Sequence, residues 1–404
     1  MKEYNNESFY RRTSISKIPL FLIKLGIYSK IGYLSILGFI LYLIQHKENN
    51  KISFLFDIFI KKNKKYMILL QKSGFREDTL FLQKSFSKII SVNFPRDFAK
   101  GIGSCFLSKD ICDNNYLSTS SRNNAGKLKL HNFYNFLFSK LPISLKPVSI
   151  ITANYGYFAE QELFKAAYLN GIKGIAIHKE CLKSKGIAEL WRYIYSVRRD
   201  QFGGSLILFY NEKELELQKS AQAYIKEKTK VKVIGCPRLD KAHLLRKNIN
   251  QPNKHKVVLF GFGNKTALPR IARKSYKDSE PSYEFLNRKD KILCWKNLLN
   301  DLCTAYYECA LDNPNIEFLI KLKPNFKENK DILDFFRKKT KLTNIEIIIK
   351  GNSIEILETS TISIGFMSST IFEGIARGIP VIIPLMGECK SENYRKYCIN
   401  FENI

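Results

Sequence analysis

The sequence is poor in the residues that build metal sites and disulfide frameworks. Its nine cysteines include no C-x-x-C pair, and none of its five histidines stands at zinc-site spacing. We therefore predict no structural metal. An odd number of cysteines without a convincing secretion signal favours reduced thiols in a cytosolic compartment.

A hydrophobic run long enough to cross a bilayer is missing as well. The uncharged stretch 31–45 has 15 residues, fewer than the roughly 20 that a spanning helix needs. A removed signal peptide is not favoured, because the stretch runs into "HKENNK" without a small-residue cleavage site. Residues 1–65 hold twelve Lys or Arg against four acids. Two interpretations stay open: a helix lying on an anionic membrane leaflet, or a helix packed on the first domain.

Acidic residues are scarce throughout the chain. Lys and Arg number 66 against 37 Asp and Glu, which gives a net charge of +29. This excess indicates an anionic partner: nucleic acid, the inner surface of a membrane or nucleotide-linked substrates. The abundance of Lys, Asn and Ile is also typical of AT-rich coding, so part of the excess needs no partner. Charge alone does not choose among these.

The distribution of apolar runs predicts an α/β protein. Hydrophobic residues make up 45% of the chain and charged residues 25%, as in folded globular proteins. Short apolar runs such as "YMILL", "VSIITA" and "KVVLF" alternate with helix-like stretches. We predict a basic, apolar segment over 1–65 and two α/β domains over 66–205 and 206–404, with the boundary between residues 200 and 238. Such a pair usually holds its ligand between the domains.

The stretch "GFMSSTIFEGIARGIPVIIP", residues 365–384, predicts a strand, a helix and a second strand. Ser368, Ser369 and Thr370 mark the helix start, and Gly378 with Pro380 marks its end. A helix start at the carboxyl end of a parallel strand favours a bound anion, most often a phosphate. The alternative is a capping box, in which Glu373 satisfies a backbone amide near Thr370.

Two other loops of the second domain suit phosphate. They are "GFGNKT" (261–266) and "KLKPN" (321–325), and with "MSST" (367–370) they are expected at one edge of the sheet. Close backbone approach and positive charge are the properties that a phosphate requires. The residues that supply them are Gly261, Gly263, Lys265, Lys321 and Lys323.

Three motifs together resemble a known superfamily. The motifs are, in this order, "GCPRLD" (235–240), "KLKPN" and "SSTIFEGIARGIP" (368–380). Together they resemble the carboxyl-terminal domain of GT-B glycosyltransferases, near the CDP-glycerol glycerophosphotransferase and capsule-polysaccharide transferase branches. The resemblance covers about 230–385 and is weak over 1–150. It implies two Rossmann-like domains facing a central cleft, preceded here by the hydrophobic helical segment.

The resemblance also implies site residues in the second domain. A nucleotide-activated donor, rather than a cofactor, binds there. Ser368, Ser369 and Thr370 then contact the donor phosphates, and Glu373 accepts hydrogen bonds from the ribose. The family's histidine in its K-x-H-P loop is replaced by Lys323, which can neutralise a leaving phosphate but donates a proton less readily.

In the first domain, the strand "GIAIH" ends at His178, where relatives carry the histidine that serves as acceptor base. An imidazole can take the acceptor hydroxyl's proton during attack. Lys179 replaces a glycine of the relatives, and Glu180 orients the imidazole or acts as the base itself. The alternative is a loop histidine without a catalytic role. Arg238 and Asp240 are expected to pair with each other in a structural role near the hinge.

These expectations predict a transferase that moves a sugar or a polyol phosphate from a nucleotide-linked donor to a surface polysaccharide or lipid-linked acceptor. It would work in the cytoplasm, with peripheral attachment to the inner face of the cell membrane as an option. A nonhydrolysing sugar-nucleotide epimerase shares the architecture. A nucleic-acid partner is not favoured, because the basic residues are dispersed and no binding motif is recognised. Lys179 and Lys323 leave open a noncatalytic relative.

Overall fold

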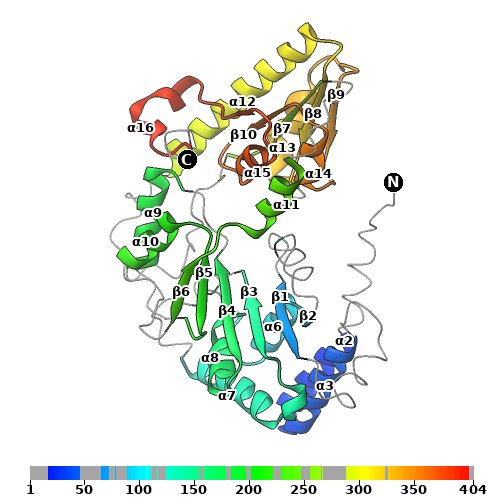
Figure 1. Ribbon diagram of the computed structural model, residues 1–404, viewed down its shortest axis with the longest axis vertical. Helices are drawn as coiled ribbons and strands as arrows, with labels where there is room; N and C mark the ends of the chain where they lie inside the picture. Colours follow the sequence, from blue (N-terminus) through cyan, green and yellow to red (C-terminus); the bar gives the residue numbers. More distant parts are fainter. Residues whose placement is uncertain are drawn as a thin grey trace. The chain divides into compact units, whose positions relative to one another are not determined.

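Two parallel β-sheets with flanking helices form the core of the described chain (Figure 1). The structure, a computed structural model, describes residues 17–45, 65–71, 78, 89–109, 111, 116, 124–153, 155, 159–178, 183–196, 202–221, 229–246, 255–264, 266, 288–323 and 326–399. The chain divides into two compact units. The first holds the described residues before 179 and those from 195 to 235, and the second holds 183–194 and those from 236 onward.

The sheet of the first unit has six strands in the order β2-β1-β3-β4-β5-β6, and every neighbouring pair is parallel. Its strands are β1 Tyr66–Gln71, β2 Ile90–Pro95, β3 Ser149–Thr152, β4 Lys173–His178, β5 Leu206–Phe209 and β6 Lys230–Val233. Residues 66–70 of β1 are all buried, because this strand lies inside the sheet. A continuous apolar run, rather than an alternating one, is the pattern that such a strand requires.

Helices of the first unit come largely from the segments between these strands. They are α2 Lys17–Tyr28, α3 Gly32–Gln45, α6 Arg96–Gly103, α7 Asn124–Lys140, the 3₁₀ helix η4 Ile143–Leu145, α8 Gln161–Leu169 and α10 Glu212–Ser220. A further helix, α9 Lys185–Ser196, lies across the division between the units. Gly171 follows α8 with a φ of 73°, the left-handed conformation expected of the glycine that stops this helix.

The apolar segment 31–45 forms helix α3, which packs on the first unit. Tyr42 donates a hydrogen bond to the backbone oxygen of Asn93 at 2.7 Å. Its ring centroid lies 5.1 Å from that of Phe94 and 4.2 Å from that of Phe98. None of the described helices is both long and apolar enough to cross a bilayer.

The first unit extends further along the chain than the sequence pattern indicates. Strand β5 pairs with β4, and β6 pairs with β5, so residues 206–235, which we expected in the second domain, belong to the first unit. The division after Gly235 falls inside the range of 200–238 that the pattern allows. Strand periodicity shows that a strand exists but does not show which sheet it joins, and this explains the difference.

The sheet of the second unit has five parallel strands in the order β11-β10-β7-β8-β9. Its strands are β7 Lys256–Phe260, β8 Glu317–Lys321, β9 Ile345–Ile348, β10 Ile362–Gly365 and β11 Val381–Ile382. Its helices are α11 Pro237–Leu245, α12 Arg288–Asp312, α13 Phe326–Arg337, α14 Ser353–Glu358, α15 Thr370–Arg377, α16 Glu392–Arg395 and the 3₁₀ helix η7 Gly387–Lys390. The expectation of two parallel α/β units is confirmed.

Candidate functional site

His178 is the last residue of β4 and lies at the carboxyl edge of the first sheet, as the sequence predicts. Its imidazole is only 3% exposed. Nε2 lies 2.8 Å from Oε1 of Glu214 and 2.9 Å from Nε2 of Gln218. The same carboxylate oxygen accepts hydrogen bonds from the Tyr195 hydroxyl at 2.9 Å and the Gln218 amide at 2.7 Å. A buried acid on α10 therefore holds the histidine.

The position of the proton on His178 follows from these contacts. A proton on Nε2 makes a charge-assisted hydrogen bond to the Glu214 carboxylate, whereas a lone pair there would face a negative oxygen. The Gln218 amide also lies 2.9 Å from Nε2, but it donates to the Glu214 oxygen, so the carboxylate decides. We infer that in the neutral ring the proton is on Nε2 and the lone pair on Nδ1. Nδ1 is buried and has no hydrogen-bond partner within the described part of the chain. Nδ1 of His178 can therefore accept a proton.

Aromatic rings fix the orientation of this imidazole. The centroid of the His178 ring lies 5.2 Å from that of Tyr155 and 5.6 Å from that of Phe209, with tilted and edge-on geometry. Such contacts limit rotation about χ2 of the histidine, because the rings occupy the space on either side. The nitrogen that faces Glu214 is thereby fixed.

A buried ion pair lies at the same edge, between the segments that follow β2 and β3, the two strands on either side of β1. Arg96 begins α6 directly after β2, and Glu160 is the N-cap residue of α8. The guanidinium donates to both carboxylate oxygens, from Nε at 2.7 Å and from Nη2 at 3.2 Å. Thr152, the last residue of β3, donates to the same carboxylate at 3.4 Å. Buried charges require such pairing, so this pair orders the starts of two helices beside the His178 strand.

The sequence pattern did not identify Glu214 as the partner of His178. It indicated Glu180, which lies outside the described residues together with Lys179. Glu214 is 36 positions from the histidine, so no local spacing connects them. Its only sequence signal is Asn211, whose side chain accepts the backbone N–H of Glu214 at 2.8 Å and caps α10.

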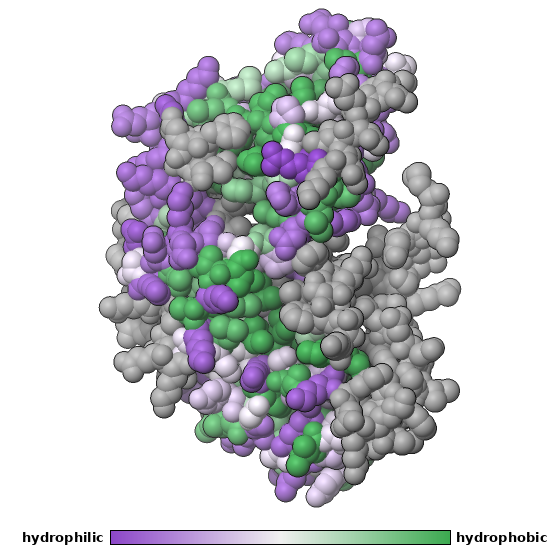
Figure 2. Space-filling view, viewed as in Figure 1, coloured by the Kyte–Doolittle hydropathy of each residue, from purple (hydrophilic) through white to green (hydrophobic). Residues whose placement is uncertain are grey.

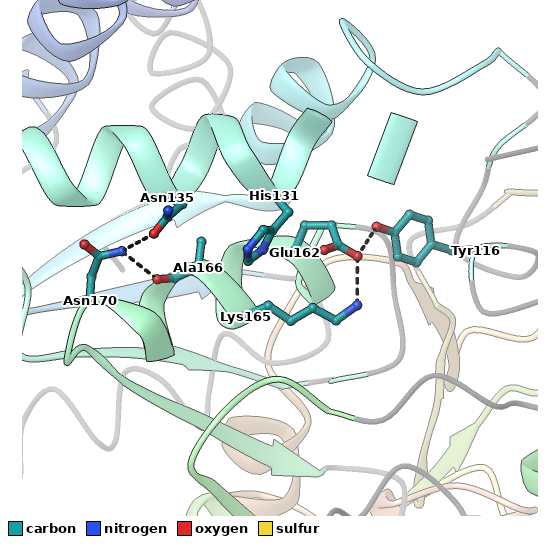
Figure 3. A network of polar contacts seen from close by, with 7 residues as sticks. All are labelled: Tyr116, His131, Asn135, Glu162, Lys165, Ala166 and Asn170. Carbon is teal, nitrogen blue, oxygen red and sulfur yellow. Dashed lines mark hydrogen bonds and ion pairs between the residues drawn. The ribbon is translucent and has the colours of Figure 1, made fainter. Parts of the chain in front are cut away.

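Another buried carboxylate of the first unit, Glu162 on α8, has a structural role (Figure 3). Its Oε1 accepts hydrogen bonds from Tyr116 at 2.9 Å and from Lys165 at 3.1 Å, and Oε2 lies 3.8 Å from Nδ1 of His131 on α7. These contacts join α7 to α8. Across all described residues, no three His, Cys, Asp or Glu side chains gather as metal ligands.

Three loops leave the second sheet side by side at its carboxyl edge. Gly365 on β10, Phe260 on β7 and Lys321 on β8 are aligned by the parallel register. The segments that follow them therefore begin at adjacent positions along this edge. Lys265 lies outside the described residues.

Several residues expected to bind phosphate contact the protein's own backbone. The ammonium of Lys321 donates to the carbonyl oxygens of Leu322 at 2.8 Å and Ile349 at 2.6 Å, and burial lowers the pKa of this lysine. The amide of Gly261 donates to the Lys321 carbonyl at 2.9 Å, and a Cβ there would lie 2.8 Å from Leu322. The amide of Gly263 donates to the Thr266 hydroxyl at 3.0 Å. Close packing thus explains why a glycine occupies position 261. The hydrogen bonds of Lys321, Gly261 and Gly263 stabilise the loops after β7 and β8.

The turn between β10 and α15 keeps its hydroxyls near the helix start. Ser368 accepts hydrogen bonds from Thr370, at 3.0 Å from the hydroxyl and 3.4 Å from the amide. Ser369 is the N-cap residue, yet its side chain makes no capping hydrogen bond. Met367 has a φ of 50°, a left-handed conformation that is costly for a residue with a side chain. Lys323 is exposed in the loop after β8, which is separated from β10 by β7.

Glu373 is buried and joins three helices of the second unit. Ser353, at the start of α14, donates a hydrogen bond to Oε2, and Nε of Arg238 on α11 lies 3.7 Å from Oε1. The capping-box alternative is therefore wrong, because this carboxylate binds a serine of another helix. Arg238 forms an ion pair with Glu373 and so joins α11 to α15. Its expected pairing with Asp240 stays a prediction.

No protein-family model matches the chain, and a search of curated proteins finds no match. Among solved structures, the chain resembles UDP-GlcNAc 2-epimerase from Neisseria meningitidis bound to UDP-GlcNAc, with 14% identity, 79% of this chain and 82% of that chain covered, and a TM-score of 0.43. It resembles Phytolacca americana UGT2 complexed with UDP-2fluoro-glucose and pterostilbene (12% identity, 79% and 80% covered, TM-score 0.36). It also resembles Thermosulfurimonas dismutans KpsC, a β-Kdo 2,4 transferase (13% identity, 80% and 81% covered, TM-score 0.23). These likenesses assign no function to the chain.

The contacts of His178 predict its tautomer. In protein labelled with ¹⁵N-histidine, we expect the long-range ¹H–¹⁵N spectrum to show a protonated Nε2 and a bare Nδ1 for this residue. Glu214→Gln should weaken this preference, because the charge-assisted bond is lost. His46→Asn and His131→Asn identify the other two first-unit signals and should leave the His178 pattern unchanged. A protonated Nδ1 with a bare Nε2 would contradict the geometry.

Proposed function

We propose that this chain is a GT-B-like transferase that moves a sugar, or a polyol phosphate, from a nucleotide-activated donor to an acceptor hydroxyl. The acceptor would be a surface polysaccharide or a lipid-linked saccharide. The observation that carries the proposal is the register of the second sheet, which aligns Gly365, Phe260 and Lys321 and so starts three loops side by side. Open parallel sheets bind ligands at this edge.

The turn before α15 has the chemistry to bind a diphosphate. Ser369 and Thr370 bring hydroxyl donors to the start of α15, where the helix dipole favours negative charge. Lys323 adds an exposed ammonium from the loop after β8. The donor's glycosyl or phosphoryl bond to the nucleotide breaks during transfer, so the negative charge grows on the departing phosphate. Groups fixed at that position stabilise the transition state more than the ground state.

Glu373 is proposed to accept hydrogen bonds from the donor ribose. Its carboxylate lies on the first turn of α15 and is buried beside Ser353 and Arg238. A ribose hydroxyl can replace the serine as donor without leaving the carboxylate unpaired. The Arg238 guanidinium, 3.7 Å from Oε1, contributes to holding this carboxylate in place.

His178 is proposed to act as the general base. Its Nδ1 carries the lone pair and would take the proton of the acceptor hydroxyl. The Glu214 carboxylate, which contacts Nε2, would stabilise the imidazolium that forms. Glu214 would then be a positioning residue, comparable in role to the acid of a catalytic triad.

A nonhydrolysing epimerase is the second candidate, and the burial of His178 favours it. An imidazole that is 3% exposed suits proton transfer on a small enclosed sugar better than on a polymer. Conversion of the sugar nucleotide without any acceptor, with the nucleotide retained on the product, would support this candidate. A nucleic-acid role has less support, since the basic residues are dispersed along the sequence and no binding motif is recognised. Figure 2 shows both hydrophilic and hydrophobic residues on the described part of the visible face.

Donor binding predicts a thermal shift. Among CDP, UDP, GDP and CMP conjugates, we expect one class to stabilise the protein, by about 2.7 kcal/mol at about 100 times its Kd. Glu373→Ala should abolish this shift, because the ribose acceptor is lost. Glu355→Ala removes an exposed acid from α14 and should retain the shift. If no class raises the Tm, or if Glu373→Ala keeps the full shift, the donor assignment is refuted.

Replacement of His178, the proposed general base, should impair turnover without impairing donor binding. With the donor that gives the shift, His178→Asn should lower kcat by about 10²- to 10⁴-fold, because the acceptor proton has no recipient. The donor-induced shift should remain, since the histidine and the donor turn belong to different units. His131→Asn is the matched control and should keep kcat. A His178→Asn enzyme with normal turnover would remove His178 from the mechanism.

A further inference from the structure

The α2–α3 hairpin at the amino-terminal side of the first unit presents an unusual apolar face. On α2, exposed residues recur at intervals of three and four: Ile18 is 62% exposed and Phe21 63%, and Leu25 and Tyr28 continue the row. This spacing places them on one side of the helix. The buried residues of α2, Pro19, Ile23 and Gly26, take the other side. The exposed face continues with Ile31, Tyr33 and Leu37.

The hairpin is held firmly, so this exposure is a fixed property of the described structure. Ser35 on α3 donates to the backbone oxygen of Ile23 on α2 at 3.0 Å. Gly26 and Gly38 allow the close approach, because a Cβ on either would lie 2.6 or 2.7 Å from backbone atoms of the opposite helix. On the opposite side, Phe39 and Tyr42 pack against Phe94 of the sheet. Figure 1 shows the two helices beside α7 at the periphery of the first unit.

The charges of the hairpin indicate what covers the apolar face. Residues 17–45 contain three lysines and no acid. Lys17 and Lys24 are two helical turns apart on α2 and adjoin the row of Ile18, Phe21 and Leu25. Lys30 is exposed in the turn between the helices. Lysines beside an apolar face can extend to lipid head groups while the apolar side chains enter the boundary with the acyl chains.

We infer that the α2–α3 hairpin is a membrane-binding surface that docks the first unit onto an anionic lipid leaflet. Helices of 12 and 14 residues are too short to span a bilayer, so they lie in its interface. Apolar contact supplies the affinity, and the lysines restrict it to anionic lipid. This inference rests on the hairpin alone and does not depend on the donor site.

Sedimentation with vesicles tests the inference on the full-length chain. We expect the protein to sediment with vesicles of phosphatidylcholine and phosphatidylglycerol, and much less with phosphatidylcholine alone. Ile18→Gln/Phe21→Gln should weaken binding by about tenfold or more, because two side chains no longer enter the interface. Lys17→Gln/Lys24→Gln should weaken it by about fivefold for each lysine and reduce its dependence on salt.

A matched control separates this face from general hydrophobicity. Leu293→Gln/Leu311→Gln removes two exposed leucines from α12 of the second unit, 57% and 55% exposed, and should leave vesicle binding unchanged. Equal binding by the Ile18→Gln/Phe21→Gln variant, or no binding by the unaltered protein, would overturn the inference. A dimer in light scattering that the same variant dissociates, without vesicle binding, would assign the face to a second copy of the chain instead.

Discussion

Parallel strand pairing is the constraint on which both units depend. Because every strand of a sheet runs in the same direction, each strand-to-helix turn emerges at one edge. In the first unit this rule brings Arg96, Thr152 and His178 to that edge from β2, β3 and β4. In the second it aligns the turns after β7, β8 and β10. Residues far apart in sequence thus come together without any local signal.

Three buried carboxylates have the same kind of position. Glu160, Glu214 and Glu373 each lie at the cap or in the first turn of a helix that follows a parallel strand. The helix amino terminus stabilises a negative charge there, and each acid also has a specific partner. Glu160 pairs with Arg96, Glu214 with His178, and Glu373 with Ser353 and Arg238. Since an unpaired buried carboxylate is costly, the partners fix the geometry as well as the charge.

The sequence predicted features that depend on local order. It placed His178 at a strand end and the helix after Ser369, with Gly378 as its left-handed stop, because caps and apolar runs are local. It did not predict the Glu214 partner of His178, which depends on the packing of α10 against β4. It assigned Lys321 to phosphate, whereas the folded chain directs this ammonium to two carbonyl oxygens. Side-chain direction at a strand end is decided by tertiary contacts that periodicity does not contain.

The central claim is the proposal that the turn after β10 binds the donor phosphates. Hydrogen exchange with and without a nucleoside diphosphate tests this claim most directly. Amides over 366–373 should exchange at least about tenfold more slowly when the nucleotide is bound, because a phosphate at the helix start suppresses the local opening of this turn. Protection confined to other segments, with 366–373 unchanged under saturating nucleotide, would contradict the account.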